Sequence, residues 1–165
     1  MDKLNIYIRS IVYGGVDGII TMFNIISGVT GAKLNPKIII ILGLATLCAD
    51  AISMGFSDYL STHANNQTSN AKENPIKNGI ITFISFILFG LIPLATFFIL
   101  LNNNSSNIWI KSYISTIISL IILGTVQSKF TKEKWYKSAI TVSLYGSVAS
   151  IVSYYIGKTI GKIVL

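Results

Sequence analysis

The chain has 165 residues, of which 52% are hydrophobic and only 12% are charged, with a mean hydropathy of +0.65 and a formal net charge of +7. A soluble domain carries about 25% charged residues, so this composition excludes an ordinary soluble domain and indicates a membrane protein. The basic residues are spread between apolar blocks, which excludes a nucleic-acid-binding patch. The single cysteine, Cys48, excludes an intrachain disulfide framework and a CxxC zinc site.

Five apolar segments are long enough to cross a hydrocarbon core about 30 Å thick, which takes roughly 20 helical residues. In chain order they are Ile11–Ala32, Ile38–Phe56, Ile80–Leu101, Ile108–Val126 and Ala139–Ile156. Strands of that length would leave backbone groups unpaired in lipid, so all five are predicted to be helices. Thr62–Pro75 is interpreted as a polar, turn-rich linker. The whole chain, residues 1–165, is therefore predicted to be one five-transmembrane-helix domain.

Basic residues near the ends of these segments indicate the orientation. With the N-terminus in the cytoplasm, eight basic residues lie on that side of the membrane and five on the other. The positive-inside rule therefore favours a cytoplasmic N-terminus and a C-terminus on the opposite side. No nucleophile–base pair, HExxH motif or phosphate-binding loop occurs, so we expect neither an enzyme nor a bound cofactor.

Polar and small residues follow one face of each of the first two predicted helices. The face of the first helix is formed, at spacings of three and four, by Gly14, Asp17, Thr21, Asn24 and Gly28. That of the second helix has Asp58 at the membrane edge and is formed by Gly43, Asp50, Met54, Ser57 and Ser61. At about 1.5 Å per residue, Asp17 lies roughly 9 Å and Asp50 roughly 12 Å from the cytoplasmic side. The two carboxylates are therefore predicted to lie at similar depth.

A charge buried in a membrane costs roughly 2.5–3.5 kcal/mol, so intramembrane carboxylates usually pair with another group or line water. No Lys or Arg is expected at the depth of Asp17 and Asp50. A protonated aspartate bonded to hydroxyl groups or backbone is one alternative, but two carboxylates beside a thioether favour a cation. This mixture of oxygen and sulfur suits Fe²⁺ or Mn²⁺ better than Mg²⁺. The predicted metal ligands are Asp17, Asp50, Met54 and Asp58, and the predicted supporting residues of the pathway are Gly14, Thr21, Asn24 and Ser57.

Small residues also recur on the last predicted helix, namely Gly146, Ser150, Gly157 and Gly161. This pattern allows membrane helices to approach closely. It fits both packing inside the bundle and a contact between two copies. We expect Gly157 and Gly161 to take part in a homodimer contact. In the third segment, Gly90 and Pro93 suggest a kink.

Four motifs, in chain order, carry a resemblance to a known family. They are YGGVDGIITMFNIISGVTGA (Tyr13–Ala32), GLATLCADAISMGFSDYLS (Gly43–Ser61), GLIPL (Gly90–Leu94) and SYYIGKTIGK (Ser153–Lys162). Together they resemble the vacuolar iron transporter family, including its shorter nodulin-like members. By this resemblance the family's first-helix aspartate falls on Asp17 and its second-helix methionine on Met54. The glutamate of its Gly-Glu-Tyr motif falls on Asp58, and Asp50 stands where the best-known members often have a small residue.

The resemblance implies a five-helix homodimer that exports Fe²⁺, or Mn²⁺, from the cytosol into a vacuole-like compartment in exchange for protons. Its expected partners are membrane lipid, divalent metal ions and a second copy. The best-known members carry a glutamate-rich cytosolic metal-binding domain between the second and third helices. Here that interval has only Glu73 beyond Asp58, so the domain is absent, as in the nodulin-like members. A non-transporting membrane-organising protein and a non-selective proton or cation pathway remain open as alternatives.

Overall fold

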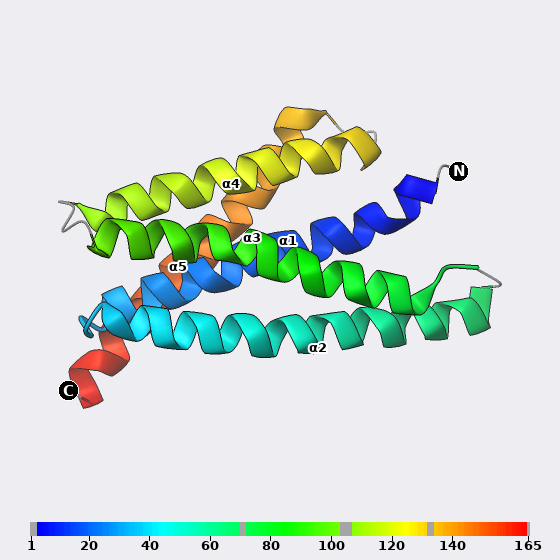
Figure 1. The fold of residues 1–165 in the computed structure, drawn as a ribbon. Helices are drawn as coiled ribbons and strands as arrows, with labels where there is room; N and C mark the ends of the chain where they lie inside the picture. The colour runs from blue at the N-terminus through cyan, green and yellow to red at the C-terminus, as the bar shows by residue number, and fades with distance from the viewer. Residues whose placement is uncertain (1–2, 70–71, 103–106, 132–133, 165) are drawn as a thin grey trace.

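The computed structural model describes residues 3–69, 72–102, 107–131 and 134–164. Five helices make up nearly all of these segments, and no strand occurs among the described residues. They are α1 Lys3–Gly31, α2 Lys37–Ser69, α3 Pro75–Asn102, α4 Ile108–Thr131 and α5 Trp135–Val164 (Figure 1). The prediction of an all-α, five-helix membrane protein is confirmed.

Length and apolar composition allow α1, α2, α3 and α5 each to cross a membrane, and α4 has a shorter apolar stretch, Ile110–Thr125, among the described residues. Large apolar side chains cover the outside of the bundle, as Ile41 at 69% and Ile163 at 78% exposure illustrate. Such a surface is favourable in lipid and unfavourable in water. Pro93 lies inside α3, which continues through it as one helix.

Successive helices run in opposite directions, so the two ends of the chain lie at opposite ends of the bundle (Figure 1). α1 is central, because it contacts all four other helices and packs most extensively against α3 and α5. α2 lies at the edge and, over the described residues, contacts only α1 and α3. Apolar side chains such as Met22, Leu47 and Phe86, all 2% exposed or less, fill the space between these three helices. This arrangement brings the polar faces of α1 and α2 next to each other.

Glycines allow α1 to approach its neighbours at backbone distance. A Cβ atom on Gly14 or Gly18 would collide with the carbonyl oxygen of Thr82 or Phe86 in α3. Close approach of this kind stabilises helix packing in lipid, where no hydrophobic force drives helices together. The glycines on either side of Asp17 therefore hold α1 directly against α3.

The small residues of α5 also pack inside the chain, which places Gly157 and Gly161 against another part of the same chain rather than on a free surface, while the expected homodimer contact stays a prediction. A Cβ on Gly157 would collide with the carbonyl oxygen of Gly28, and one on Gly161 would lie 2.9 Å from Cα of Ala32. The first contact is with α1, and the second is with the residue that directly follows it. Gly146 faces Leu120 of α4, and the Ser150 hydroxyl donates to the Ser147 carbonyl within α5.

The predicted linker Thr62–Pro75 is wrong over its first half, because α2 continues as a helix to Ser69. No proline or glycine interrupts the chain between Gly55 and Pro75, and the buried Thr62 side chain accepts hydrogen bonds from α1 and α3. These tertiary contacts override the turn preference of the asparagines. α1 likewise begins at Lys3 rather than at the predicted Ile11, which places Arg9 and Ser10 on the helix.

Candidate functional site

Asp17 of α1 and Asp50 of α2 are both half-buried and lie close enough for their charges to interact. Their depths were predicted to match, and this proximity agrees with that. Among the described residues, neither carboxylate makes a hydrogen bond or an ion pair. Two unpaired carboxylates inside a membrane bundle repel each other and attract cations. The pair is therefore a feature of α1 and α2 that attracts cations.

The surface of α1 near Asp17 is only partly covered. α2 and α5 make no contact with each other among the described residues, so the part of α1 between them has no helix over it. Tyr13, one turn before Asp17, is 52% exposed, and Ser57, two turns after Asp50, is also exposed. The polar faces of α1 and α2 thus open towards the outside of this single chain.

The other predicted residues near the pair differ in their surroundings. Met54 lies one turn from Asp50 and packs, partly buried, against the apolar cluster of α1, α2 and α3. Asn24 lies two turns from Asp17, and its Oδ1 atom is buried without a hydrogen-bond partner. Its backbone carbonyl accepts a 2.7 Å hydrogen bond from the Ser153 hydroxyl of α5. The Met54 thioether is available as an additional metal donor, whereas Asn24 lies about 10 Å along α1 from Asp17. Thr21, between Asp17 and Asn24, is half-buried.

Asp58 does not join the Asp17–Asp50 pair, so the four predicted metal ligands do not form one site in this structure. Among the described residues no three His, Cys, Asp or Glu side chains gather into a group that could hold a metal. The physical reason is the helix rise: eight residues separate Asp58 from Asp50, which is about 12 Å along α2. Asp58 lies instead in a second polar cluster nearer the end of the helix.

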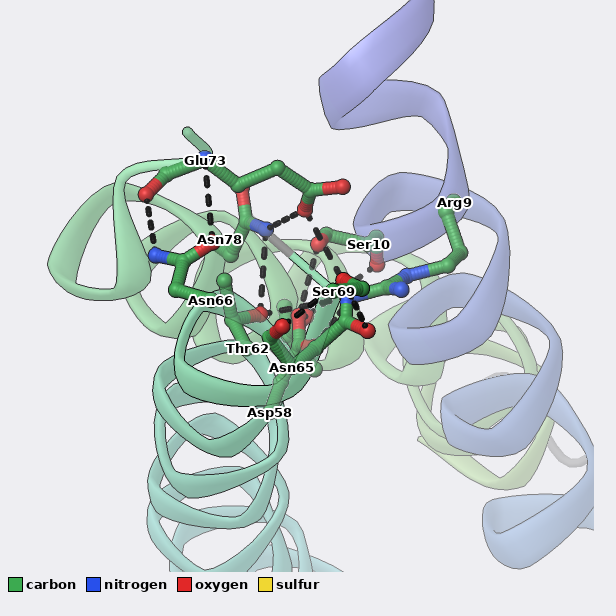
Figure 2. A network of polar contacts seen from close by, with 10 residues as sticks. Arg9, Ser10, Asp58, Thr62, Asn65, Asn66, Ser69, Glu73 and Asn78 are labelled. Atoms are coloured by element: carbon green, nitrogen blue, oxygen red, sulfur yellow. Dashed lines mark hydrogen bonds and ion pairs between the residues drawn. The ribbon is translucent and has the colours of Figure 1, made fainter. Parts of the chain in front are cut away.

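This second cluster, which we call the Arg9 cluster, joins the start of α1, the last turns of α2 and the start of α3 (Figure 2). The Asp58 carboxylate, only 5% exposed, accepts hydrogen bonds from Ser10 Oγ at 2.6 Å and Thr82 Oγ1 at 2.5 Å. Arg9 Nη2 lies 3.3 Å from Asp58 Oδ1. A buried carboxylate is stable only with such partners. The cluster consists of Arg9, Ser10, Asp58, Thr62, Glu73, Asn78 and Thr82.

The outer side of the Arg9 cluster is built around Glu73 and Asn78. Asn78 Nδ2 donates to Thr62 Oγ1 at 3.1 Å and to Glu73 Oε2 at 2.8 Å. Asn78 Oδ1 is buried and has no hydrogen-bond partner. Glu73 Oε2 is also 3.9 Å from Arg9 Nη2, so Arg9 lies between two carboxylates.

Sequence reasoning missed most of the Arg9 cluster because it began the first helix at Ile11 and ended the second at Phe56. A signal was available. Ser10 precedes Asp17 by seven residues and so continues the polar face of α1, while Thr62 follows Asp58 by four. If the first predicted helix had been extended towards the N-terminus and the second towards the C-terminus, Arg9 would have been placed opposite Asp58.

Fold and site together define a five-helix membrane protein with a carboxylate pair between its first two helices. A family model described as the VIT family matches residues 8–74 and 65–158. The chain therefore belongs to the VIT family.

Curated relatives match this chain over most of their length. A vacuolar iron transporter of Plasmodium falciparum (isolate 3D7) is 29% identical over 229 residues, covering 95% of this chain and 82% of the relative. A vacuolar iron transporter of Toxoplasma gondii (strain ATCC 50861 / VEG) is 26% identical, with 96% and 76% covered. Vacuolar iron transporter homolog 3 of Arabidopsis thaliana is 24% identical over 172 residues, with 94% and 84% covered.

The lengths of these matches distinguish two kinds of relative. The match to the Plasmodium falciparum protein runs over 229 residues, more than the 165 of this chain, so that relative has segments with no counterpart here. The match to the Arabidopsis thaliana homolog runs over 172 residues, so far fewer residues of that relative lack a counterpart here. The two segments of the family match meet at residues 65–74, around the connection between α2 and α3. In length, the chain is thus closer to the Arabidopsis thaliana homolog than to the Plasmodium falciparum protein.

Proposed function

We propose that this protein is an integral membrane transporter that moves Fe²⁺, or Mn²⁺, out of the cytosol in exchange for protons. The observation that carries the proposal is the Asp17–Asp50 pair, two half-buried carboxylates without a basic partner among the described residues. Relatives named vacuolar iron transporters support iron as the cargo. The basic residues near the N-terminal side of the bundle support a cytosolic N-terminus, and the named relatives support a vacuole-like membrane.

The exchange follows from the charge of the pair. A divalent cation between Asp17 and Asp50 neutralises both carboxylates and removes their mutual repulsion. Two protons arriving from an acidic compartment neutralise the pair equally well, and they release the metal because a protonated carboxyl is a poor ligand. Metal and protons therefore occupy the site alternately, and its net charge is zero in both states. The Met54 thioether, one turn from Asp50, supplies the further donor that favours Fe²⁺ or Mn²⁺ over Mg²⁺.

We further propose that a second copy covers the polar faces of α1 and α2. Half-buried carboxylates facing lipid are costly, and α1 lies uncovered between α2 and α5 beside them. A two-fold axis through this opening would bring two copies of the same face together and enclose a polar path. The contact proposed here differs from the one first expected on α5.

Disulfide crosslinking tests this dimer. In a Cys48→Ser background, Ser57→Cys places a thiol on the exposed side of α2 that carries Asp50. Mild oxidation of membranes is expected to link two copies at position 57. The unsubstituted protein is the control, because Cys48 is exposed nine residues, or two and a half turns, away on the opposite side of α2. Crosslinking through Cys48 but not through position 57 would place the dimer contact elsewhere.

Metal uptake into proteoliposomes tests the transport function itself. Purified protein is reconstituted, an inside-acidic pH gradient is imposed, and the initial uptake of Fe²⁺, Mn²⁺, Zn²⁺ and Ca²⁺ is compared. We expect Fe²⁺ and Mn²⁺ uptake that rises with the gradient and is accompanied by proton efflux. Proton flux without metal uptake would favour the non-selective pathway. Absence of both fluxes would favour the membrane-organising protein.

Met54→Leu is expected to retain the fold and to lower Fe²⁺ transport on the order of tenfold, because a metal donor is lost. Leucine has a similar volume, so the packing cost stays below about 1.5 kcal/mol. The matched control is Met22→Leu, since Met22 is fully buried in the same apolar cluster on α1. Equal Fe²⁺ uptake by both variants and the unsubstituted protein would make Met54 a packing residue only.

A further inference from the structure

The Arg9 cluster lies between the Asp17–Asp50 pair and the end of the bundle that carries the N-terminus. Arg9 precedes Asp17 by eight residues on α1, and Asp58 follows Asp50 by eight on the antiparallel α2. Both spacings correspond to about 12 Å along the helix axis. The two polar sites therefore form successive layers, and an ion that moves from this end of the bundle to the pair first meets the outer layer.

The helices next to this outer layer are in backbone contact. Gly14 of α1 touches the Thr82 carbonyl of α3. A Cβ on Gly55 of α2 would lie 2.8 Å from the carbonyl oxygen of Gly79 in α3, and one on Gly79 would lie 2.6 Å from that of Gly55. Contacts this close leave no room for a hydrated ion between the same helices. These contacts exclude an ion path between α1 and α3 and between α2 and α3, and they leave the polar faces of α1 and α2 beside the Arg9 cluster as the route.

We propose that Arg9 is a tethered cation that closes this end of the transporter, and that an incoming divalent metal displaces its guanidinium from Asp58 and Glu73. The direction of ion movement in this inference rests on the proposed function. Arg9 Nη2 lies 3.3 Å from Asp58 Oδ1 and 3.9 Å from Glu73 Oε2, the position of a cation shared by two carboxylates (Figure 2). The Arg9 side chain is 54% exposed, so water can receive the guanidinium when it leaves.

The oxygen atoms of the cluster form a donor set for a divalent metal. Asp58 and Glu73 supply two negative charges, of which Arg9 neutralises only one. Asn78 Oδ1, buried and without a hydrogen-bond partner, is a further oxygen within the same cluster. A divalent cation neutralises both carboxylates and binds hard oxygen donors, so it competes with the guanidinium. With only two carboxylates, the cluster would hold a metal ion briefly on its way to the Asp17–Asp50 pair.

Metal binding at equilibrium tests the inference separately from transport. The Asp17→Asn background weakens the inner site, and free Mn²⁺ is measured by electron paramagnetic resonance during titration of the detergent-solubilised protein. Adding Arg9→Gln is expected to tighten Mn²⁺ binding about tenfold, because a cation that competes for Asp58 and Glu73 has been removed. Adding Asp58→Asn to Arg9→Gln is expected to abolish the gain. Glu73→Gln replaces Asp58→Asn if the latter does not fold.

Lys77→Gln is the matched control, since it removes one positive charge at the same end of the bundle. The Lys77 side chain is exposed, and its backbone N–H donates to Asn74 Oδ1. Screening by salt keeps its expected effect on Mn²⁺ affinity within about twofold. Circular dichroism and thermal unfolding establish that each variant is folded.

The sign of the affinity change separates a tethered cation from a purely structural cluster. If the cluster only joins three helices, Arg9→Gln lowers thermal stability and leaves Mn²⁺ affinity unchanged or weaker, which overturns the proposal. A gain that survives Asp58→Asn also overturns it. If Arg9→Gln does not fold, Arg9→Lys is tested for the same increase in Mn²⁺ affinity. A lysine lacks the planar guanidinium and therefore competes less well with Mn²⁺ for the two carboxylates. Failure of metal uptake in proteoliposomes would instead count against the proposed function, since this titration involves no transport.

Discussion

Asp17→Asn is expected to yield a folded, membrane-inserted protein whose Fe²⁺ uptake into proteoliposomes falls on the order of 100-fold. Asparagine keeps the size and the hydrogen-bonding capacity of the side chain but removes its charge. Asp50 alone cannot neutralise a divalent cation, so the metal loses its site. The substitution also removes the repulsion between Asp17 and Asp50, and the thermal stability of the apoprotein is therefore expected to be equal or higher.

The partner residue gives this prediction its control. Asp50→Asn is expected to cause a similar loss, and the double variant should be no worse than either single variant, because the two carboxylates act as one unit. Circular dichroism and gel filtration establish folding in each case. Undiminished transport of Fe²⁺ and Mn²⁺ by folded Asp17→Asn protein would remove Asp17 from the metal site and refute the proposed role of the pair.

The second large effect is expected from Gly157→Ile, which should prevent α5 from packing on α1. Even a Cβ atom at this position collides with the Gly28 carbonyl oxygen. That oxygen belongs to the helix backbone, so it cannot move aside as the end of a side chain can. We expect a cost on the order of 3 kcal/mol or more, seen as loss of folded protein and a lower unfolding temperature in detergent. The loss should appear in the monomer, without a shift in the monomer–dimer equilibrium.

Thr159→Ile is the control for this substitution. Thr159 is exposed on α5, two residues from Gly157, so the same bulky side chain there points towards lipid. Stability close to that of the unsubstituted protein is expected. Wild-type stability of Gly157→Ile would show that α5 does not pack on α1 in this way, and a contact between copies through α5 would again be the better explanation.

Much of the fold could be predicted because it depends on properties that a single segment already has. A helix that crosses lipid needs roughly 20 apolar residues, and such runs are visible in the sequence. The similar depth of Asp17 and Asp50 also follows from local rules, since helix rise and antiparallel direction determine it. Both features required no knowledge of which helix packs against which.

The features that were missed depend on contacts between distant parts of the chain. The polar end of α2 remains helical because Thr62 is buried against Arg9 and Asn78, and hydropathy gives no sign of that. Gly157 lies on a stripe of small residues, and such a stripe has the same appearance whether its partner is α1 or a second copy. The pairing of Asp58 with an arginine 49 positions away in the chain likewise depends on such a contact.

The length of α2 has a consequence for insertions between α2 and α3. Its 33 residues correspond to about 50 Å, while the hydrocarbon core is about 30 Å thick. The last turns of α2 and the start of α3 can therefore extend beyond the lipid. The hydrogen bonds of the Arg9 cluster hold these two helix ends together. A folded domain inserted between these two helix ends would leave the membrane helices in place. An insertion at this connection is therefore expected to leave the packing of the five-helix bundle intact.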